Sequence, residues 1–158
     1  MRNLITATFT TLLLATGVPV FALSASQTVE KEIVVQMPDG TETISRETAE
    51  RVAPGERVVY TLNFTNDDAQ TATDLVLTMP VPKEVRFMEG SASDVNMVPV
   101  YSADGGSSFA ARELLRVRTA DGSLQAASSG DITHIRWTVP GPIAVGETGE
   151  LSFKGILR

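Results

Sequence analysis

The feature that most constrains this chain is a pair of alternating apolar runs between Val52 and Pro82, each bounded by turn-forming residues. Pro54-Gly55 opens the first run, Asn66-Asp67-Asp68 separates the two runs, and a Pro-x-Pro sequence closes the second. A period of two residues is typical of a β-strand with one buried face, and proline cannot donate to a sheet ladder. The segment therefore predicts two consecutive strands of an antiparallel sheet.

Short strand patterns separated by turn residues continue along the rest of the chain. Strands are expected within residues 29–37, 41–45, 71–79, 85–87, 98–102, 114–119, 132–139 and 151–157. Residues 46–52 could form a helical turn or an extended edge, and residues 107–114 could instead hold one helical turn. Strands of this length and spacing predict an all-β fold, namely an immunoglobulin-like antiparallel β-sandwich of about 7–9 strands.

The alternation also predicts which side chains face the core and which strands lie at the edges. In the first run the even-numbered apolar residues should face inward, whereas Val59 and Thr61 should lie on the opposite face. The predicted core comprises Tyr60, Leu62, Phe64, Leu75, Leu77, Trp137 and Phe153. The first and last strands, around Ile33 and Phe153, are the expected edges of the sheets.

An apolar leader precedes the predicted sandwich. Arg2 supplies a positive start, residues 4–20 are mostly apolar or small, and Val20-Phe21-Ala22 resembles a signal-peptidase site. We therefore expect a signal peptide over residues 1–22, with a second possible cleavage site after Ala25, and one domain over residues 23–158. A retained transmembrane anchor is the alternative, but the run is shorter than the roughly 20 residues of a span and contains polar, Gly and Pro residues. The mature chain is expected in the periplasm or outside the cell, without a transmembrane anchor.

The net charge and the absence of cysteine argue against several kinds of ligand and site. The formal net charge is −6, and cleavage that removes Arg2 would make it −7. Because an acidic chain is repelled by phosphates, we expect it to bind neither nucleic acid nor anionic membranes. The sequence contains no cysteine, which excludes disulfides, thiolate metal sites, cysteine nucleophiles and a lipoprotein anchor.

Several segments, taken in their order along the chain, resemble one known family. Val52–Asn66 resembles the Pro-Gly-Asp-x-Val-x-Tyr opening, with its later Asn, of the DUF11 conserved repeat domain, and Ala72–Pro82 resembles its next strand and exit. Tyr101–Phe109 resembles its Tyr-Ser-x-Asp-Gly-Gly-x-x-Phe segment, and Ile135–Phe153 resembles its closing strands. The resemblance implies an immunoglobulin-like sandwich of bacterial surface and secreted proteins, here in a single exported copy.

Candidates for catalysis are few. His134 is the only histidine, and we expect it on the strand face opposite Ile135 and Trp137. A Ser-His-Asp site needs an oriented base and a strained nucleophile, and the sequence has no Gly-x-Ser-x-Gly motif. Asp67-Asp68 could act as paired carboxylates in glycoside hydrolysis, but aspartates between two strands more often cap turns. We therefore expect no catalytic residue, no enzyme activity and no cofactor.

Small-ligand binding is the second possibility that the residues allow. The carboxylates of Asp67, Asp68 and Asp104 could supply oxygen ligands to calcium, although they do not form a spaced calcium-binding loop. Trp137 and Tyr101 could form a sugar-stacking platform, but aromatic residues of a sandwich more often fill its core. We therefore expect no metal site and expect both aromatic side chains in the core.

These expectations combine into one leading hypothesis and one alternative. The leading hypothesis is a non-enzymatic, exported domain that acts as an interaction or structural module of the bacterial cell envelope or secreted fraction. Its partner would be a protein, bound through an edge strand or a sheet face, or an envelope polysaccharide, because unpaired edge groups can accept a partner's strand. The alternative is a module that binds glycan or calcium through its loops.

Overall fold

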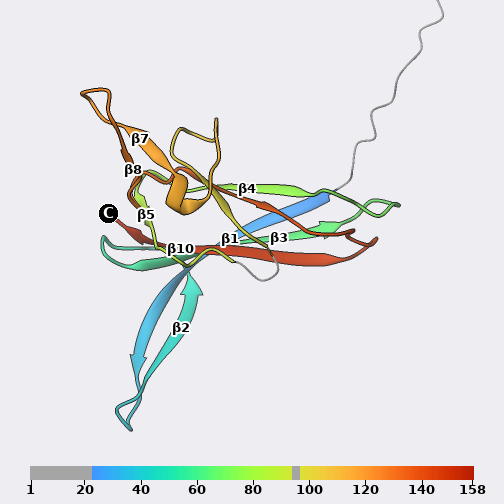
Figure 1. The fold of residues 1–158 in the computed structure, drawn as a ribbon. Helices are drawn as coiled ribbons and strands as arrows, with labels where there is room; N and C mark the ends of the chain where they lie inside the picture. The colour runs from blue at the N-terminus through green and yellow to red at the C-terminus, as the bar shows by residue number, and fades with distance from the viewer. Residues whose placement is uncertain (1–22, 94–96) are drawn as a thin grey trace, which may run out of the picture.

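The computed structural model describes residues 23–93 and 97–158, and the expected signal peptide over residues 1–22 lies outside them. This part of the chain contains ten β-strands, one 3₁₀ turn at Arg112–Leu114 and no α-helix (Figure 1). The strands are, in chain order, β1 (Leu23–Gln36), β2 (Glu42–Thr48), β3 (Arg57–Asn66), β4 (Val76–Pro80), β5 (Val85–Phe87), β6 (Val100–Ser102), β7 (Arg116–Arg118), β8 (Leu124–Ala126), β9 (His134–Thr138) and β10 (Thr148–Leu157).

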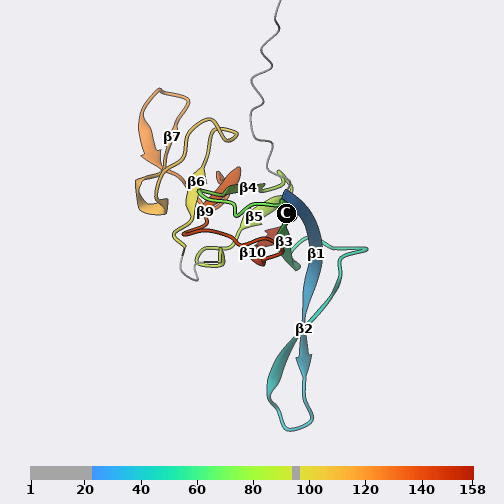
Figure 2. The ribbon, with the colours of Figure 1, turned by 90° about the vertical axis from the view of Figure 1, so that its right-hand side faces the viewer.

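Two antiparallel sheets form the layers of the sandwich. The larger sheet has the strand order β2-β1-β3-β10-β5, and the smaller has the order β4-β9-β6 (Figures 1 and 2). The all-β antiparallel sandwich predicted from the sequence is confirmed. The strand that exceeds the expected number is β8, which pairs only with β7 and is exposed along its length. No apolar alternation marked it, because it buries no face.

Apolar side chains from both sheets fill the space between them. Tyr60 of β3 stacks on Phe153 of β10 with ring centroids 4.9 Å apart, and Phe87 of β5 meets Tyr101 of β6 across the layers at 5.5 Å. Trp137 of β9 is 0% exposed and donates its indole N–H to the Ser93 carbonyl at 2.8 Å. The predicted core is confirmed for Tyr60, Phe64, Leu77, Trp137 and Phe153, whereas Leu62 and Leu75 are only partly buried against it.

The central strand β3 is buried on its core face and, at two positions, on its outer face as well. Val59 is 1% exposed and Thr61 is also buried, although both lie on the face opposite the core. The neighbours of Val59 in register are Glu30 on β1 and Lys154 on β10, whose long side chains can lie over it. Alternation identified the strand correctly, but it could not show that charged neighbours cover the outer face.

The edges of the larger sheet also differ from the prediction in one place. Phe153 does not lie at an edge, because β10 runs between β3 and β5. Beyond β5 the next residues continue to cover β10, since the Ser91 and Ser93 hydroxyls accept its backbone N–H groups at Lys154 and Ser152. Ile33 does lie near an edge, because from that residue onward β1 pairs with β2 alone.

Candidate functional site

The β1–β2 hairpin leaves the sandwich and projects as a separate two-stranded ribbon (Figure 2). β1 pairs with β3 from Leu23 to Glu32 and with β2 from Glu30 to Gln36. We call residues 33–45, which lie beyond the last β1–β3 pair, the arm. Every residue of β2 is exposed. Because both faces of β2 are exposed to water, the strand contributes no side chain to the core. The arm is therefore the first candidate for a functional surface.

The tip of the arm is closed by an ordered turn. Met37 donates its backbone N–H to the Thr41 carbonyl at 2.8 Å, and Gly40 donates to the Met37 carbonyl at 3.0 Å. Gly40 has a φ of 84°, a conformation that glycine adopts without strain. The hydroxyl and the N–H of Thr41 both donate to Asp39, and these bonds lower the pKa of that carboxyl. The sequence Asp39-Gly40 thus forms the hairpin turn that its chemistry predicted.

The root of the arm is fixed to the sandwich by charged side chains. Glu32 is 2% exposed at its side chain, and its Oε1 lies 2.5 Å from Lys154 Nζ on β10. Arg46 of β2 lies 3.8 Å from the same carboxylate and 4.0 Å from Glu30. Ala49 adds a backbone hydrogen bond to the Val29 carbonyl at 3.0 Å. These contacts hold the position at which the hairpin leaves the larger sheet.

The arm carries apolar side chains on both of its faces. Val34 and Ile44 lie directly opposite each other in the ladder and are 50% and 55% exposed. Val35 and Met37, on the other face, are also exposed. Isolated exposed apolar residues are ordinary on a protein surface, but a cross-strand pair on a projecting ribbon provides a continuous apolar contact area.

The outer edge of β2 presents a regular row of backbone groups. Along an antiparallel ladder, hydrogen-bonded pairs alternate with non-hydrogen-bonded pairs. The Met37–Thr41 and Val29–Ala49 bonds, one at each end of this hairpin, both join odd-numbered residues. The odd-numbered residues of β2 therefore bond to β1. The outward backbone groups belong to the even-numbered residues, which are Glu42, Ile44, Arg46 and Thr48. Within the described ranges, no strand pairs with this edge.

The histidine considered for catalysis contacts neighbouring residues of its own region. His134 lies at the start of β9, and its Nδ1 is 3.2 Å from Thr133 Oγ1. Its ring packs near Gly106, where an added Cβ would lie 3.5 Å from Nδ1. The side chain is partly exposed on the face opposite Ile135 and Trp137, as predicted.

Asp104 accepts four hydrogen bonds within residues 102–108. It accepts hydrogen bonds from the hydroxyls of Ser108 at 2.6 Å and Ser102 at 2.7 Å, and from the N–H groups of Ser107 and Ser108. These bonds, led by that from the Ser108 hydroxyl, hold the pKa of Asp104 well below its usual range. The carboxylate therefore organises its own loop, as a turn aspartate does.

The three aspartates considered for calcium lie at opposite ends of β9. Gly105, beside Asp104, donates its N–H to Thr133 just before β9, at 3.0 Å. Asp67-Asp68 follows Asn66, whose side-chain amide donates to the Ile143 carbonyl just after β9, at 2.9 Å. The structure therefore does not bring these aspartates together as ligands of one ion.

The proposed sugar-stacking residues are also separated from the surface. Trp137 and Tyr101 are both buried, and both belong to the core between the sheets. A stacking platform needs an exposed ring face, so neither side chain can supply one in this structure. The expectation that both residues fill the core is confirmed.

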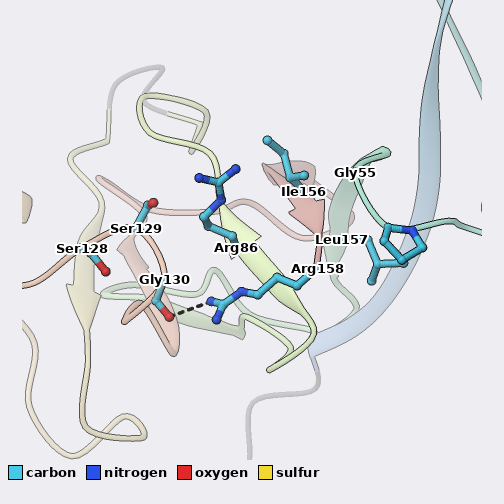
Figure 3. Close-up of a pocket in the computed structure, with 9 residues that line it drawn as sticks. Gly55, Arg86, Ser128, Ser129, Gly130, Ile156, Leu157 and Arg158 are labelled. Carbon is cyan, nitrogen blue, oxygen red and sulfur yellow. Dashed lines mark hydrogen bonds between the residues drawn. The ribbon is translucent and has the colours of Figure 1, made fainter.

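An open hollow of about 730 Å³ lies where residues 54–55, residues 128–130 and the last three residues approach each other. Arg158 donates to the Gly130 carbonyl at 2.7 Å and lies 3.4 Å from the Val85 carbonyl. Arg86 is exposed, and its side chain extends away from the Arg158–Gly130 contact (Figure 3). The two guanidinium groups therefore do not converge on one anion position.

Comparisons with known proteins leave the family open. A scan of protein-family models and searches of curated proteins and of solved structures found no match to this chain. Within residues 23–93 and 97–158, the structure contains no helix that could span a bilayer. In the same ranges, His, Asp and Glu side chains do not gather in threes as the ligands of a metal ion would.

Proposed function

We propose that this chain is a non-enzymatic, exported interaction module of the bacterial cell envelope or secreted fraction, and that it binds a protein through its arm. The observation that carries this proposal is the outer edge of β2, where outward backbone groups alternate along a fully exposed strand. An exposed edge can accept a partner's strand through main-chain hydrogen bonds, and side chains on alternate positions then supply specificity.

The arrangement of the arm supports a binding role over a passive one. Proteins usually protect an edge strand by keeping it short, covering it or placing charges on it. The opposite side of the larger sheet follows this rule, since the Ser91 and Ser93 hydroxyls cover β10. The β2 edge carries the charged Glu42 and Arg46, but the apolar Ile44 lies between them and is 55% exposed, and no strand of the described ranges covers it.

The start of β1 supports the expected processing of the leader. Cleavage after Ala22 would keep every pair that the structure describes between β1 and β3, from Leu23 onward. Cleavage after Ala25 would remove the pairs that Leu23 and Ala25 make with Asn66 and Phe64. We therefore favour the first site, and we propose that the described domain is DUF11-like.

A crosslinking pull-down from the source cell, with the tagged mature chain at native expression level, tests the binding role. Ile44→Lys places a charge at the centre of the β2 edge, and Val76→Lys is the matched control because Val76 is 50% exposed on β4 of the other sheet. We expect a stoichiometric protein partner with the wild type and with Val76→Lys, and its loss with Ile44→Lys. Equal capture by both variants would contradict a role for the arm, and retention only on envelope polysaccharide would favour a glycan-binding module.

A further inference from the structure

The side chains along the open edge of β2 are complementary to themselves when the strand is reversed. We propose that this edge binds the same edge of a second copy of the chain, antiparallel, about a two-fold axis at Ile44. The inference rests on the proposed function, because it names the partner that the arm accepts. Such an interface is isologous, so each contact occurs twice.

Backbone geometry limits the registers that two β2 strands can adopt. The outward groups belong to even-numbered residues, so an even-numbered residue of one copy must face an even-numbered residue of the other. Three registers pair at least five of the seven residues of β2, and they are centred on Ile44, on Ser45 and on Arg46. In the first, Ile44 exchanges both backbone hydrogen bonds with the second copy's Ile44, and Glu42 exchanges them with the second copy's Arg46.

Side-chain chemistry selects the register centred on Ile44. It places Glu42 opposite the second copy's Arg46 and Arg46 opposite the second copy's Glu42, so two opposite-charge pairs flank an apolar centre. The register centred on Ser45 would place Ile44 opposite Arg46 and would pair Glu42 with Thr48. The register centred on Arg46 would oppose the two Arg46 side chains and would pair Ile44 with Thr48. Directly opposed cross-strand pairs stabilise a sheet when they are oppositely charged or both apolar.

The same register brings the exposed apolar side chains on one face of the two arms into contact. Val34 lies opposite Ile44 within each hairpin, so pairing about Ile44 makes one row of four apolar side chains across a four-stranded sheet. On the other face, Thr43 meets the second copy's Ser45, and these small polar side chains pack without a buried charge. Arg46 can make this pairing and keep its contacts with Glu30 and Glu32, at 4.0 Å and 3.8 Å, because its guanidinium group has five N–H donors and its side chain is 44% exposed.

Sedimentation velocity of the purified mature chain over a concentration series tests the inference. We expect a reversible species of twice the monomer mass. Glu42→Arg sets like charges opposite each other at both pairs and should raise the dissociation constant of the dimer at least about tenfold. Arg46→Glu should do the same, whereas an equimolar mixture of the two variants restores both pairs and should recover a heterodimer. Circular dichroism shows whether each variant remains folded.

Cysteine crosslinking provides a readout that does not depend on the charge variants. The chain has no cysteine, so Ile44→Cys introduces one thiol at the proposed axis, and Val98→Cys introduces one at an exposed residue far from β2 in the sequence. Opposed residues in a hydrogen-bonded pair have Cα atoms about 5.5 Å apart, within the range that a disulfide bridges. Mild oxidation should therefore link Ile44→Cys chains at least about tenfold faster than Val98→Cys chains.

The outcomes separate this inference from the proposed function. A dimer that responds to the charge variants and crosslinks at residue 44 supports it. A chain that stays monomeric throughout the series, with equal crosslinking at residues 44 and 98, overturns it, as does a dimer that Glu42→Arg leaves unchanged. If the purified chain is monomeric but the pull-down captures a different protein through Ile44, the second-copy inference fails and the proposed function stands.

Discussion

Strands β2 and β3 both carry apolar residues among polar ones, but β2 is exposed to solvent and β3 is largely buried. β3 alternates Val58, Tyr60, Leu62 and Phe64 with smaller or polar residues. A second sheet covers its core face, and Val59 and Thr61 are buried on its outer face as well. β2 also carries an apolar residue among polar ones, yet all of its residues are exposed. The difference lies in topology, since within residues 23–93 and 97–158 no third strand pairs with the β1–β2 hairpin after β1 passes the end of β3. A strand pattern therefore indicates extended structure, whereas the neighbouring strands decide burial.

The largest expected loss of stability comes from a substitution in the core, and a substitution in the arm should cause almost none. Trp137→Ala removes a fully buried indole and leaves the Ser93 carbonyl without its donor, so it should lower the free energy of unfolding by about 3–5 kcal/mol. Ile44→Ala, measured at a concentration where the chain is monomeric, should change it by less than about 0.5 kcal/mol. Urea denaturation followed by circular dichroism measures both. Similar losses for the two variants would mean that the arm packs on the sandwich.

The next effect tests how the arm is fixed to the sandwich. Lys154→Met removes the closest cation from a Glu32 carboxylate whose side chain is 2% exposed, and we expect a loss of about 2 kcal/mol. This lies below the range for fully buried pairs because Lys154 is partly exposed and Arg46 remains nearby. Lys83→Met, at an exposed residue before β5, is the control and should be neutral. A neutral Lys154→Met would show that the ion pair does not hold the root.

A loss of stability of similar size is expected where two strands of the sandwich approach closely. A Cβ at Gly149 would lie 2.2 Å from the ring of Phe64, its cross-strand neighbour on β3. Gly149→Ala must therefore displace a buried ring and should cost about 1–3 kcal/mol. Gly130→Ala is a matched control, because neither glycine has a positive φ and its Cβ would meet mainly the flexible end of Arg158. Thermal unfolding of the two variants should rank them in this order, and equal melting temperatures would contradict the tight packing.

The smallest effect concerns the turns, in the arm and in the β7–β8 hairpin. Hydrogen bonds from Thr119, and then from Ser123, lower the pKa of Asp121 to about 2, and Thr41 lowers that of Asp39 in the same way. A carboxyl group whose pKa is lower in the folded chain than in the unfolded chain stabilises the folded state. This stabilisation reaches its full size above the pKa of the unfolded chain, near 4, and is lost as the pH falls toward 2. Asp121→Asn should therefore lower the melting temperature at pH 7 but hardly at pH 2. A difference that grows on acidification would contradict this sign.

The sandwich could be predicted from the sequence because most strands show strong apolar alternation and clear turn residues separate them. β5 occurs at the predicted residues, and Trp137 and Tyr101 are buried in the predicted core. Leu23–Thr28, the first part of β1, was not predicted because its small and polar residues show no period. β8 was missed for the same reason.

The candidate site was only partly predictable. The run Ile33-Val34-Val35 and the Asp39-Gly40 turn indicated a hairpin, and apolar residues at consecutive positions were a signal that both faces of β1 carry them. The projection of the hairpin could not be read locally, because it depends on where pairing between β1 and β3 ends. The contact between Glu32 and Lys154 joins residues far apart in the sequence, so no local pattern could reveal it.

Residue-resolved amide hydrogen exchange along β2, measured by NMR at low and high protein concentration, tests the central claim most directly. At low concentration, the amides of Thr43, Ser45 and Glu47 should be protected through their bonds to β1, while those of Ile44 and Arg46 exchange rapidly. At high concentration, Ile44 and Arg46 should become protected as their edge pairs with a second copy. Protection of Ile44 and Arg46 that is already complete at low concentration would contradict an open edge, and rapid exchange at every position of β2 would contradict an ordered arm.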